Sequence, residues 1–310
     1  MKNGIRSAKG RSMRAKTGRV AFGLVAAMWS AACLPPPAPE VSGPPQRIVS
    51  MSPGLTETVC AVGCGDRLVA VTDYCRYPEK VRQLPKVGGY LDPNVEAIVA
   101  LEPDLVLLME SQGELGPRLS RLGLRTAVVS QHDITAVLQS FVEVAELCGS
   151  RASGEALQCD VRAHLGRISQ LLAREAAPRV LAVVARPVGN GSIESVWAAA
   201  PSTFVGDVIT FAGGRNALET GVGEGAYPEV SVEGLIHLDP DVILDLVSEE
   251  QGEGLTKENL RADWQNLTVL SAVQADRVEV LRQPFLVVPG PRVAEVVETV
   301  ARRLHPEARW

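Results

Sequence analysis

The chain has 310 residues, of which 46% are hydrophobic, and its 36 acidic and 31 basic side chains leave a net charge of −5. A chain of this length can bury one large core or two smaller ones. The acidic balance, with no basic stripe beyond the N-terminal region, disfavours a protein that binds nucleic acid.

Residues 1–33 have the pattern of an export signal. Seven Lys or Arg and no acid lie before residue 20, and residues 20–32 are mostly apolar and small. This apolar run is too short to span a bilayer by itself. Its end, Ser30–Cys33, resembles a lipobox in which Ser30 stands where leucine is usual. We therefore expect lipidation of Cys33 and a membrane anchor, with a simple cleaved signal as the alternative.

Residues 34–46 are rich in proline and predict a stiff tether between anchor and domain. Removal of the signal takes away seven positive charges, so the net charge falls from −5 to −12. The exported part is therefore strongly acidic.

Residues 47–149 alternate predicted strands with predicted helices. Ser52 is placed to cap a helix with Pro53 in its first turn. Strands are expected at residues 47–51, 68–72, 105–109 and 126–129. This alternation predicts an α/β lobe with a mainly parallel sheet and helices on both faces. Ligands meet such sheets at the carboxyl ends of the strands, where Tyr74 and Tyr90 lie on loops.

Residues 150–177 predict one long helix. Apolar side chains recur every three or four positions from residue 156 to residue 172, and Pro178 prevents continuation. We expect Ser153 to cap the start of the helix. At 1.5 Å per residue the helix is about 37 Å long, roughly the width of a domain. It is either an ordinary helix within one domain or a strut between two lobes.

Residues 178–310 repeat the plan of the first lobe. Strands are expected at residues 179–184, 242–246 and 278–281, and helices at residues 204–211 and 293–304. The loop aromatics of this second lobe are predicted to be Trp197, Tyr227 and Phe285.

A sequence repeat favours the strut. VEAIVALEPDLVLL (95–108) and VEGLIHLDPDVILD (232–245) align without a gap, and each predicts a short helix that a proline ends before a buried strand. The predicted fold is therefore α/β, with two Rossmann-like lobes whose mainly parallel sheets are joined by a single long backbone helix. Glu96 and Glu233 begin the two short helices, where the helix dipole alone explains a carboxylate. Alternatively, they present matching contacts to a two-fold symmetric partner.

The five cysteines beyond Cys33 suggest a disulfide, because oxidising compartments favour pairing. We prefer Cys148 with Cys159; the other three are Cys60, Cys64 and Cys75. With no CxxC and four scattered histidines (His132, His164, His237, His305), we expect no metal site. Each of the five loop aromatics can pack its own loop, but together they can line an apolar cleft for a large ring-shaped ligand.

Segments throughout residues 47–306 resemble the helical-backbone substrate-binding proteins of ABC importers. They are RIVSMSPGLTETVCAVGCGDRLVAVTDYCRYP, VGGYLDPNVEAIVALEPDLVL, TFVGDVITFAGGRN, YPEVSVEGLIHLDPDVIL and GPRV. The resemblance implies two α/β lobes on one rigid helix, a shallow cleft between them, and delivery of ligand to an ABC permease dimer with its ATPase subunits. Within the family the likeness is greatest to cobalamin-binding proteins, with ferric-siderophore and haem binders as near relatives.

By position, the resemblance places Tyr74, Tyr90, Trp197, Tyr227 and Phe285 in the ligand cleft. It also implies that Glu96 and Glu233 dock onto arginines of the permease. We expect an exported monomer that is not an enzyme, has no intrinsic cofactor and binds cobalamin.

Departures from the family pattern leave the ligand open. Tyrosine or phenylalanine stands at cleft positions that can be tryptophan in cobalamin binders. Siderophore binders often place arginines in the cleft, and the candidates here are Arg76, Arg186 and Arg292, of which Arg292 is expected to support its own loop. An exported enzyme is the rival from another class, but no hydrolase, metalloprotease or P-loop motif occurs. A receptor with the same fold is a third possibility.

Overall fold

The computed structural model describes residues 43–90, 92–218 and 225–310. All of these residues belong to one compact unit. The export signal, Cys33 and most of the proline-rich tether lie outside the described residues. Within the described ranges, no helix combines the length and the apolar character needed to cross a membrane.

The first lobe is built on a four-stranded parallel sheet in the order β2-β1-β3-β4. Its strands are β1 (Ile48–Ser50), β2 (Leu68–Val71), β3 (Leu105–Met109) and β4 (Thr126–Val129), which confirms the strands predicted for this part of the chain.

Helices cover both faces of this sheet. Alternate residues of each strand point to opposite faces, so one strand contributes side chains to two cores. Leu105 and Leu107 belong to the core beneath α1 (Pro53–Ala61) and the second half of α4 (Ile134–Leu147). Val106 and Leu108 belong to the core beneath α2 (Val95–Ala100) and α3 (Leu115–Arg121). As predicted, Ser52 caps α1 by accepting a hydrogen bond from the Leu55 amide.

The second lobe has a six-stranded mixed sheet in the order β10-β9-β5-β6-β8, with β7 also paired to β5. Its strands are β5 (Arg179–Ala185), β6 (Ser195–Ala198), β7 (Arg215–Asn216), β8 (Glu229–Ser231), β9 (Val242–Leu246) and β10 (Val278–Leu281). β10, β9 and β5 are parallel, whereas β6 and β8 run antiparallel to their neighbours. The expectation of a loop at Trp197 is wrong: Trp197 lies in β6, between the buried Val196 and Ala198, and points away from the core.

One face of this second sheet packs against α6 (Phe204–Phe211), α10 (Val293–Leu304) and the long helix α5. The other face carries α7 (Val232–Leu238), α9 (Ser271–Gln274) and the buried Trp264, while α8 (Lys257–Ala262) lies beside β10. Four short 3₁₀ turns complete the two lobes: Gly65–Arg67, Glu79–Gln83, Glu110–Gln112 and Pro284–Val287.

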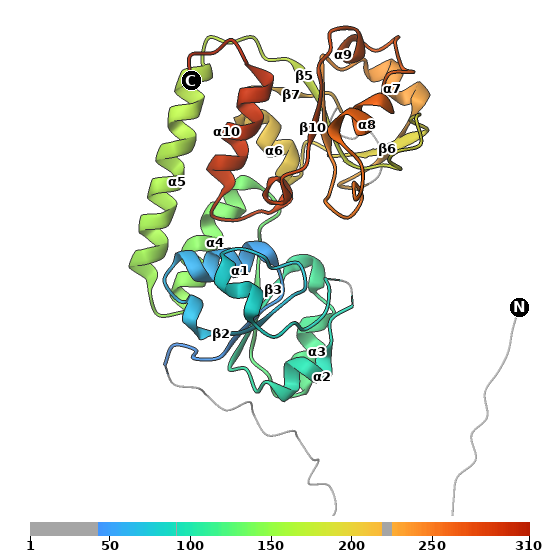
Figure 1. The fold of residues 1–310 in the computed structure, drawn as a ribbon. Helices are drawn as coiled ribbons and strands as arrows, with labels where there is room; N and C mark the ends of the chain where they lie inside the picture. Colours follow the sequence, from blue (N-terminus) through green and yellow to red (C-terminus); the bar gives the residue numbers. More distant parts are fainter. Residues whose placement is uncertain (1–42, 91, 219–224) are drawn as a thin grey trace, which may run out of the picture. The chain divides into compact units, whose positions relative to one another are not determined.

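The predicted long helix is α5 (Arg151–Leu172), and it connects the two lobes (Figure 1). It begins after Ser150, so Ser153 is not its N-cap, and it ends five residues earlier than Pro178 requires. Leu157 packs against the cores of both lobes.

The connection is a pair of helices, because α4 packs along α5. The first half of α4 places Ile134 and Val137 in the core of the second lobe, and its second half places Val144 and Ala145 in the core of the first. Gly154 of α5 makes this packing possible, since a Cβ atom there would lie 2.4 Å from the Phe141 carbonyl oxygen.

The two repeat segments adopt matching structures. Both turns after the short helices place an acidic residue in the left-handed region, Glu102 at φ 45° and Asp239 at φ 35°. The aspartate two residues later fastens the strand to the neighbouring chain. Asp104 accepts from the Arg47 amide at 2.9 Å, and Asp241 accepts from the Arg179 amide at 2.7 Å. The repeat therefore marks equivalent α-turn-β units in the two lobes.

Candidate ligand-binding cleft

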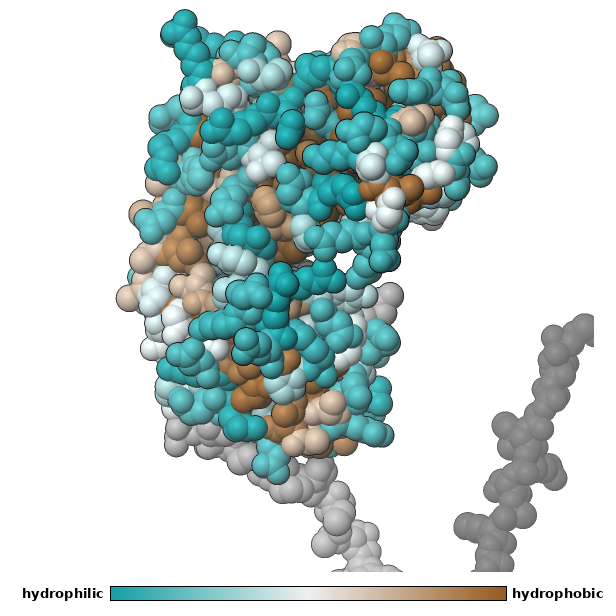
Figure 2. Space-filling model, viewed as in Figure 1, coloured by the Kyte–Doolittle hydropathy of each residue, from teal (hydrophilic) through white to brown (hydrophobic). Residues whose placement is uncertain are grey.

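A cavity of about 240 Å³ lies between the two lobes. The second lobe supplies most of its wall from the carboxyl ends of three parallel strands, through Val184, Leu246 and Leu281, together with residues 283–284 and 286–288. The first lobe contributes Tyr74 and Arg76 from the loop after β2. This is the edge at which parallel sheets bind ligands. Figure 2 shows hydrophilic side chains bordering the opening between the lobes.

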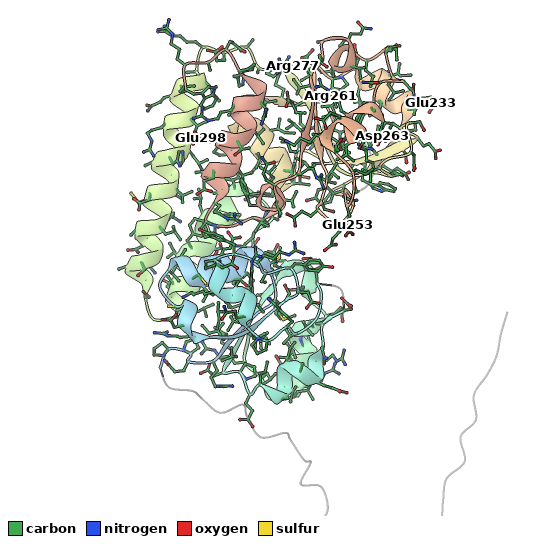
Figure 3. The ribbon with its side chains drawn as sticks, viewed as in Figure 1. Glu233, Glu253, Arg261, Asp263, Arg277 and Glu298 are labelled. Carbon is green, nitrogen blue, oxygen red and sulfur yellow. The ribbon has the colours of Figure 1, made fainter. Side chains whose placement is uncertain are left out.

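An ion pair bridges the rim of this cavity. Arg76 Nη1 lies 2.8 Å from Glu249 Oε2, and Arg76 Nη2 lies 3.6 Å from Glu250 Oε1. All three side chains are about half exposed or more. The same loop carries Glu253 at the edge of the second lobe that faces the first (Figure 3). Arg76 is thus held by carboxylates of the opposite lobe, and opening of the lobes would break these contacts.

A second and more buried ion pair also joins the lobes. Arg292 donates to both carboxylate oxygens of Glu57, at 2.9 and 2.5 Å, and the Glu57 side chain is only 4% exposed. The guanidinium lies 4.3 Å from the ring centre of Tyr77 and 5.0 Å from that of Phe285. Burial raises the pKa of Glu57, while Arg292 opposes that shift. Arg292 therefore supports its own loop through Phe285, as expected, and it also joins that loop to the first lobe through Glu57.

The backbones of the two lobes meet beside this pair. A Cβ atom on Gly54, at the start of α1, would lie 2.0 Å from the Pro289 carbonyl oxygen. Gly290 approaches the same residue, and a Cβ atom there would lie 3.3 Å from the Gly54 Cα. At Gly54 only glycine allows so close a contact, which fixes one end of the cleft.

The five aromatic side chains predicted to line the cleft do not all lie at one place in the structure. Tyr74, 52% exposed, lines the cavity, whereas Phe285 stacks on Arg292 and packs against the core of the second lobe. Tyr90 donates to Ser111, and it lies close enough to Tyr227 to perturb its ionisation. Burial raises the pKa of both phenols, although 45% of the Tyr227 surface stays exposed. Trp197 is 37% exposed on β6.

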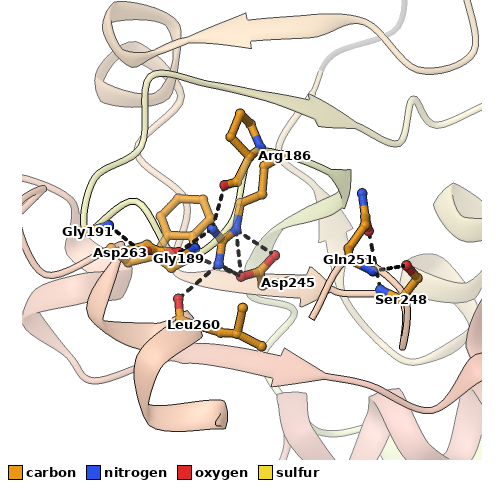
Figure 4. Close-up of polar contacts among 10 residues, drawn as sticks. Arg186, Gly189, Gly191, Asp245, Ser248, Gln251, Leu260 and Asp263 are labelled. Atoms are coloured by element: carbon orange, nitrogen blue, oxygen red, sulfur yellow. Dashed lines mark hydrogen bonds and ion pairs between the residues drawn. The ribbon is translucent and has the colours of Figure 1, made fainter. Parts of the chain in front are cut away.

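Arg186 is not a cleft residue, contrary to the expectation. Its side chain is 1% exposed and lies inside the second lobe between Asp245 and Asp263, with Nη2 and Nη1 each 2.7 Å from a carboxylate oxygen (Figure 4). Nη2 also donates to the Leu260 carbonyl, and Trp264 Nε1 donates to Asp245. Two buried carboxylates and two backbone carbonyls, those of Pro187 and Leu260, accept from this guanidinium, so it has a structural role.

The repeat glutamates occupy matching positions on the surface. Glu96 and Glu233 are each the second residue of a short helix, and both are exposed. Asn94 and Ser231 cap these helices by accepting hydrogen bonds from the amides of Ala97 and Gly234. The backbone amide of Glu233 and the Ser231 hydroxyl lower the pKa of the Glu233 carboxyl. Glu233 points outward from α7 (Figure 3).

The preferred disulfide between Cys148 and Cys159 is wrong. Cys148 is buried in the first lobe, whereas Cys159 is exposed on α5, and the structure contains no bond between them. Spacing along the chain gave no information about the direction in which either side chain points.

One group of possible metal ligands occurs in the part of the chain that the structure describes. Single ligand atoms of Glu175, His305 and Glu307 lie within 4.8 Å of one another beyond the end of α5. His305 Nε2 is 3.2 Å from the Ala212 carbonyl oxygen. None of these residues lines the cavity between the lobes, and the cluster alone does not define a metal site.

Comparison with known proteins agrees with the fold described above. The model of a family described as "Periplasmic binding protein" matches residues 48–284. The chain belongs to the periplasmic binding protein family. A vitamin B12-binding protein of Vibrio campbellii is 25% identical over 227 residues, which cover 73% of this chain and 78% of that protein.

Two solved periplasmic binding proteins have similar folds. A haem-binding protein from Pseudomonas aeruginosa has a TM-score of 0.73 and 28% identity, covering 86% of this chain and 94% of its own. The vitamin B12-binding protein of Vibrio cholerae has a TM-score of 0.71 and 26% identity, covering 85% and 98%. The relatives are binding proteins, and they include both cobalamin-type and haem-type members, so the family does not determine the ligand.

The bridging carboxylates Glu57, Glu249 and Glu250 are site residues that were not predicted from the sequence. A signal for two of them exists, because Glu249 and Glu250 lie three and four residues beyond the end of β9, at the carboxyl end of a parallel strand. For Glu57 no local signal exists, since it lies in the middle of α1 and its partner is in the other lobe.

Proposed function

We propose that this chain is the exported substrate-binding component of an ABC importer, and that it captures a corrinoid, cobalamin in particular, between its lobes. The family and the fold support the transport role, and relatives named for vitamin B12 or cobalamin support the ligand. The observation that carries the ligand proposal is the exposed Tyr74 ring on the inter-lobe cavity, beside an arginine that is already neutralised.

The charges of the cleft favour a cargo without strong anionic groups. Arg76, the cavity arginine, faces Glu249 and Glu250, and Arg292 faces Glu57. An anionic cargo would have to displace a carboxylate from one of these guanidinium groups. A corrinoid carries amide side chains around its ring and needs apolar contact more than cationic partners. Aromatic contact of this kind contributes about 0.5–1.5 kcal/mol per ring beyond the area buried.

Capture requires the lobes to open. The cavity of about 240 Å³ is below the range of roughly 300–1,000 Å³ typical of ligand pockets. A macrocycle therefore enters only when the Arg76 bridge breaks and the rim widens, while the buried Glu57–Arg292 pair and the α4–α5 pair keep the other side together.

Haem is the second candidate, and the tyrosine at the cavity favours it. A phenol oxygen is a ligand for ferric iron, and Tyr74 presents one at the rim. Titration of the purified protein with cyanocobalamin, haem and a ferric hydroxamate separates the candidates. We expect saturable 1:1 binding of cyanocobalamin and weaker binding of the others. A new charge-transfer band with haem, together with no response to cyanocobalamin, would replace the corrinoid by haem.

We also propose that Glu96 and Glu233 dock the two lobes onto the permease. The double variant Glu96→Arg with Glu233→Arg should abolish uptake of labelled cobalamin by cells carrying the cognate importer, without changing cobalamin affinity. Glu258→Arg is the matched control, because Glu258 is likewise the exposed second residue of a capped helix but lies outside the repeat. Equal loss of uptake in the control would refute a specific docking role, and so would loss of affinity in the double variant.

Export, lipidation of Cys33 and a monomeric state complete the proposal. Cys33→Ala should release the protein from the membrane fraction while leaving ligand binding unchanged. Retention of the variant in the membrane would show that the lipid is not the anchor.

A further inference from the structure

Two of the cysteines stand at the ends of neighbouring helices in the first lobe. After α1 the chain turns through Gly63 at φ 86°, and the Cys64 amide donates to the Val59 carbonyl at 2.9 Å. Cys148 is the C-cap of α4, followed by Gly149 at φ 71°. Both backbone positions are therefore fixed by helix-ending turns of the same type.

The two thiols lie in the same buried core. Cys64 is 3% exposed and Cys148 is 1% exposed, and both belong to the same buried cluster. Cys64 lies close enough to Cys148 to help raise the pKa of the Cys148 thiol. Arg67 ties the two segments together, since its amide donates to the Cys64 carbonyl at 3.0 Å and its Nη1 donates to the Cys148 carbonyl at 2.8 Å.

The remaining described cysteines have other surroundings. Cys75 Sγ lies 3.2 Å from the Thr56 hydroxyl and 3.1 Å from that of Thr72, so both of its near neighbours are hydroxyl groups. Cys60 lies near Lys80 and Cys75 but is only partly buried, and Cys159 is exposed on α5. Among the described cysteines, Cys64 and Cys148 are the pair that is buried in one core and joined through a common arginine, Arg67.

We propose that Cys64 and Cys148 form a disulfide in the exported protein, which staples the C-terminal end of α1 to that of α4. The proposal rests on the export proposed above, because an oxidising compartment is needed. The oxidant is a disulfide, such as that of a thiol oxidoreductase or of oxidised glutathione. A thiolate attacks it and forms a mixed disulfide, and the second thiolate then displaces the other sulfur. Two thiols lose two protons and two electrons, and the oxidant disulfide becomes two thiols.

The bond is formed before the core closes. Burial, reinforced by the neighbouring Cys64, raises the pKa of Cys148 to about 12, so the folded protein holds almost no reactive thiolate there. The same burial protects the finished disulfide from reducing agents. The staple also lies on the end of α4 that belongs to the first lobe, so it strengthens this lobe without crossing the cleft.

Differential alkylation of the full chain tests the proposal. Protein recovered from the exported fraction is denatured, treated with N-ethylmaleimide, reduced, treated with iodoacetamide, and mapped by peptide mass. We expect the second label on Cys64 and Cys148 alone. Reduction should lower the melting temperature of the wild type by roughly 5 °C or more, and leave that of the Cys64→Ala/Cys148→Ala variant unchanged. The proposal would be overturned if N-ethylmaleimide modified both Cys64 and Cys148 in the exported protein, or if a different pair of cysteines carried the second label.

A refolding arm separates this inference from the export it assumes. The reduced, unfolded full chain is refolded in a glutathione redox buffer, with Cys159→Ala as the matched control. The same pair should form in both chains. If the protein is retained inside the cell with reduced thiols while the refolded chain forms the pair, the export proposal fails and the pairing stands. If the refolded chain lacks the pair, the inference is refuted whatever its location.

Discussion

Replacement of Arg186 by methionine should destabilise the second lobe severely. Methionine keeps most of the length of the side chain but removes the charge, and it leaves Asp245 and Asp263 without their partner at 1% side-chain exposure. Asp263 keeps the amides of Gly189 and Gly191, at 2.8 and 2.7 Å, and Asp245 keeps the Trp264 indole. These donors do not replace a positive charge.

The magnitude follows from breaking a buried pair. Removal of one partner of such a pair costs about 3–5 kcal/mol, because the other charge stays buried and uncompensated. Burial alone would raise the pKa of Asp263, but Arg186 and the two glycine amides together hold it below its usual range. For a domain of this size, the loss corresponds to a fall in melting temperature of roughly 5–9 °C.

Thermal unfolding followed by circular dichroism measures the effect, with Arg76→Met as the matched control. The control removes the same charge from an ion pair that is about half exposed, where the expected cost is below about 1 kcal/mol. Equal melting temperatures for the two variants would refute the assignment of Arg186 to a buried structural network. A large fall in melting temperature in Arg76→Met alone would mean that Arg76, and not Arg186, has the structural role.

Two further predictions concern the long helices and acid stability. Gly154→Ala should destabilise the protein by about 1–3 kcal/mol, because its Cβ would press on the Phe141 carbonyl. Gly166→Ala on the same helix has open space around it and should stabilise the protein by up to about 1 kcal/mol. Urea unfolding of the two variants measures both changes, and equal effects on the free energy of unfolding would contradict the prediction. Hydrogen bonds from Arg302 and then His164 lower the pKa of Glu298 below 4.5, so its stabilising contribution is present above that pH and is lost as the pH falls through the folded-state pKa. Glu298→Gln should therefore melt below the wild type at pH 7, by a difference that shrinks as the pH falls below 4.5, and a difference that stays constant with pH would exclude this linkage.

Local patterns were enough to predict much of the fold. The periodic apolar side chains predicted α5, and the repeat predicted matching helix–turn–strand units that the structure confirms down to Asp104 and Asp241. The antiparallel strands β6 (Ser195–Ala198) and β8 (Glu229–Ser231) were missed, because their pairing is set by the rest of the sheet.

The cleft was predicted less completely, since its rim is made by contacts between distant segments. Tyr74 was found because it lies on a loop at the carboxyl end of a strand. The resemblance to siderophore binders made Arg186 a candidate for the cleft, but the structure buries it against Asp245 and Asp263. Whether a charged residue near a strand end faces solvent or a buried partner depends on residues more than 50 positions away, which no local pattern reveals.

The most direct test of the corrinoid-binding cleft is the cyanocobalamin affinity of Tyr74→Ala, measured by equilibrium dialysis beside the wild type. Phe211→Ala is the control, because Phe211 is also an exposed aromatic residue but does not line the inter-lobe cavity. Loss of a stacked ring should weaken binding roughly tenfold in Tyr74→Ala. The Phe211→Ala variant should bind as the wild type does. Unchanged affinity in Tyr74→Ala, or an equal loss in both variants, would contradict capture of the ligand between the lobes.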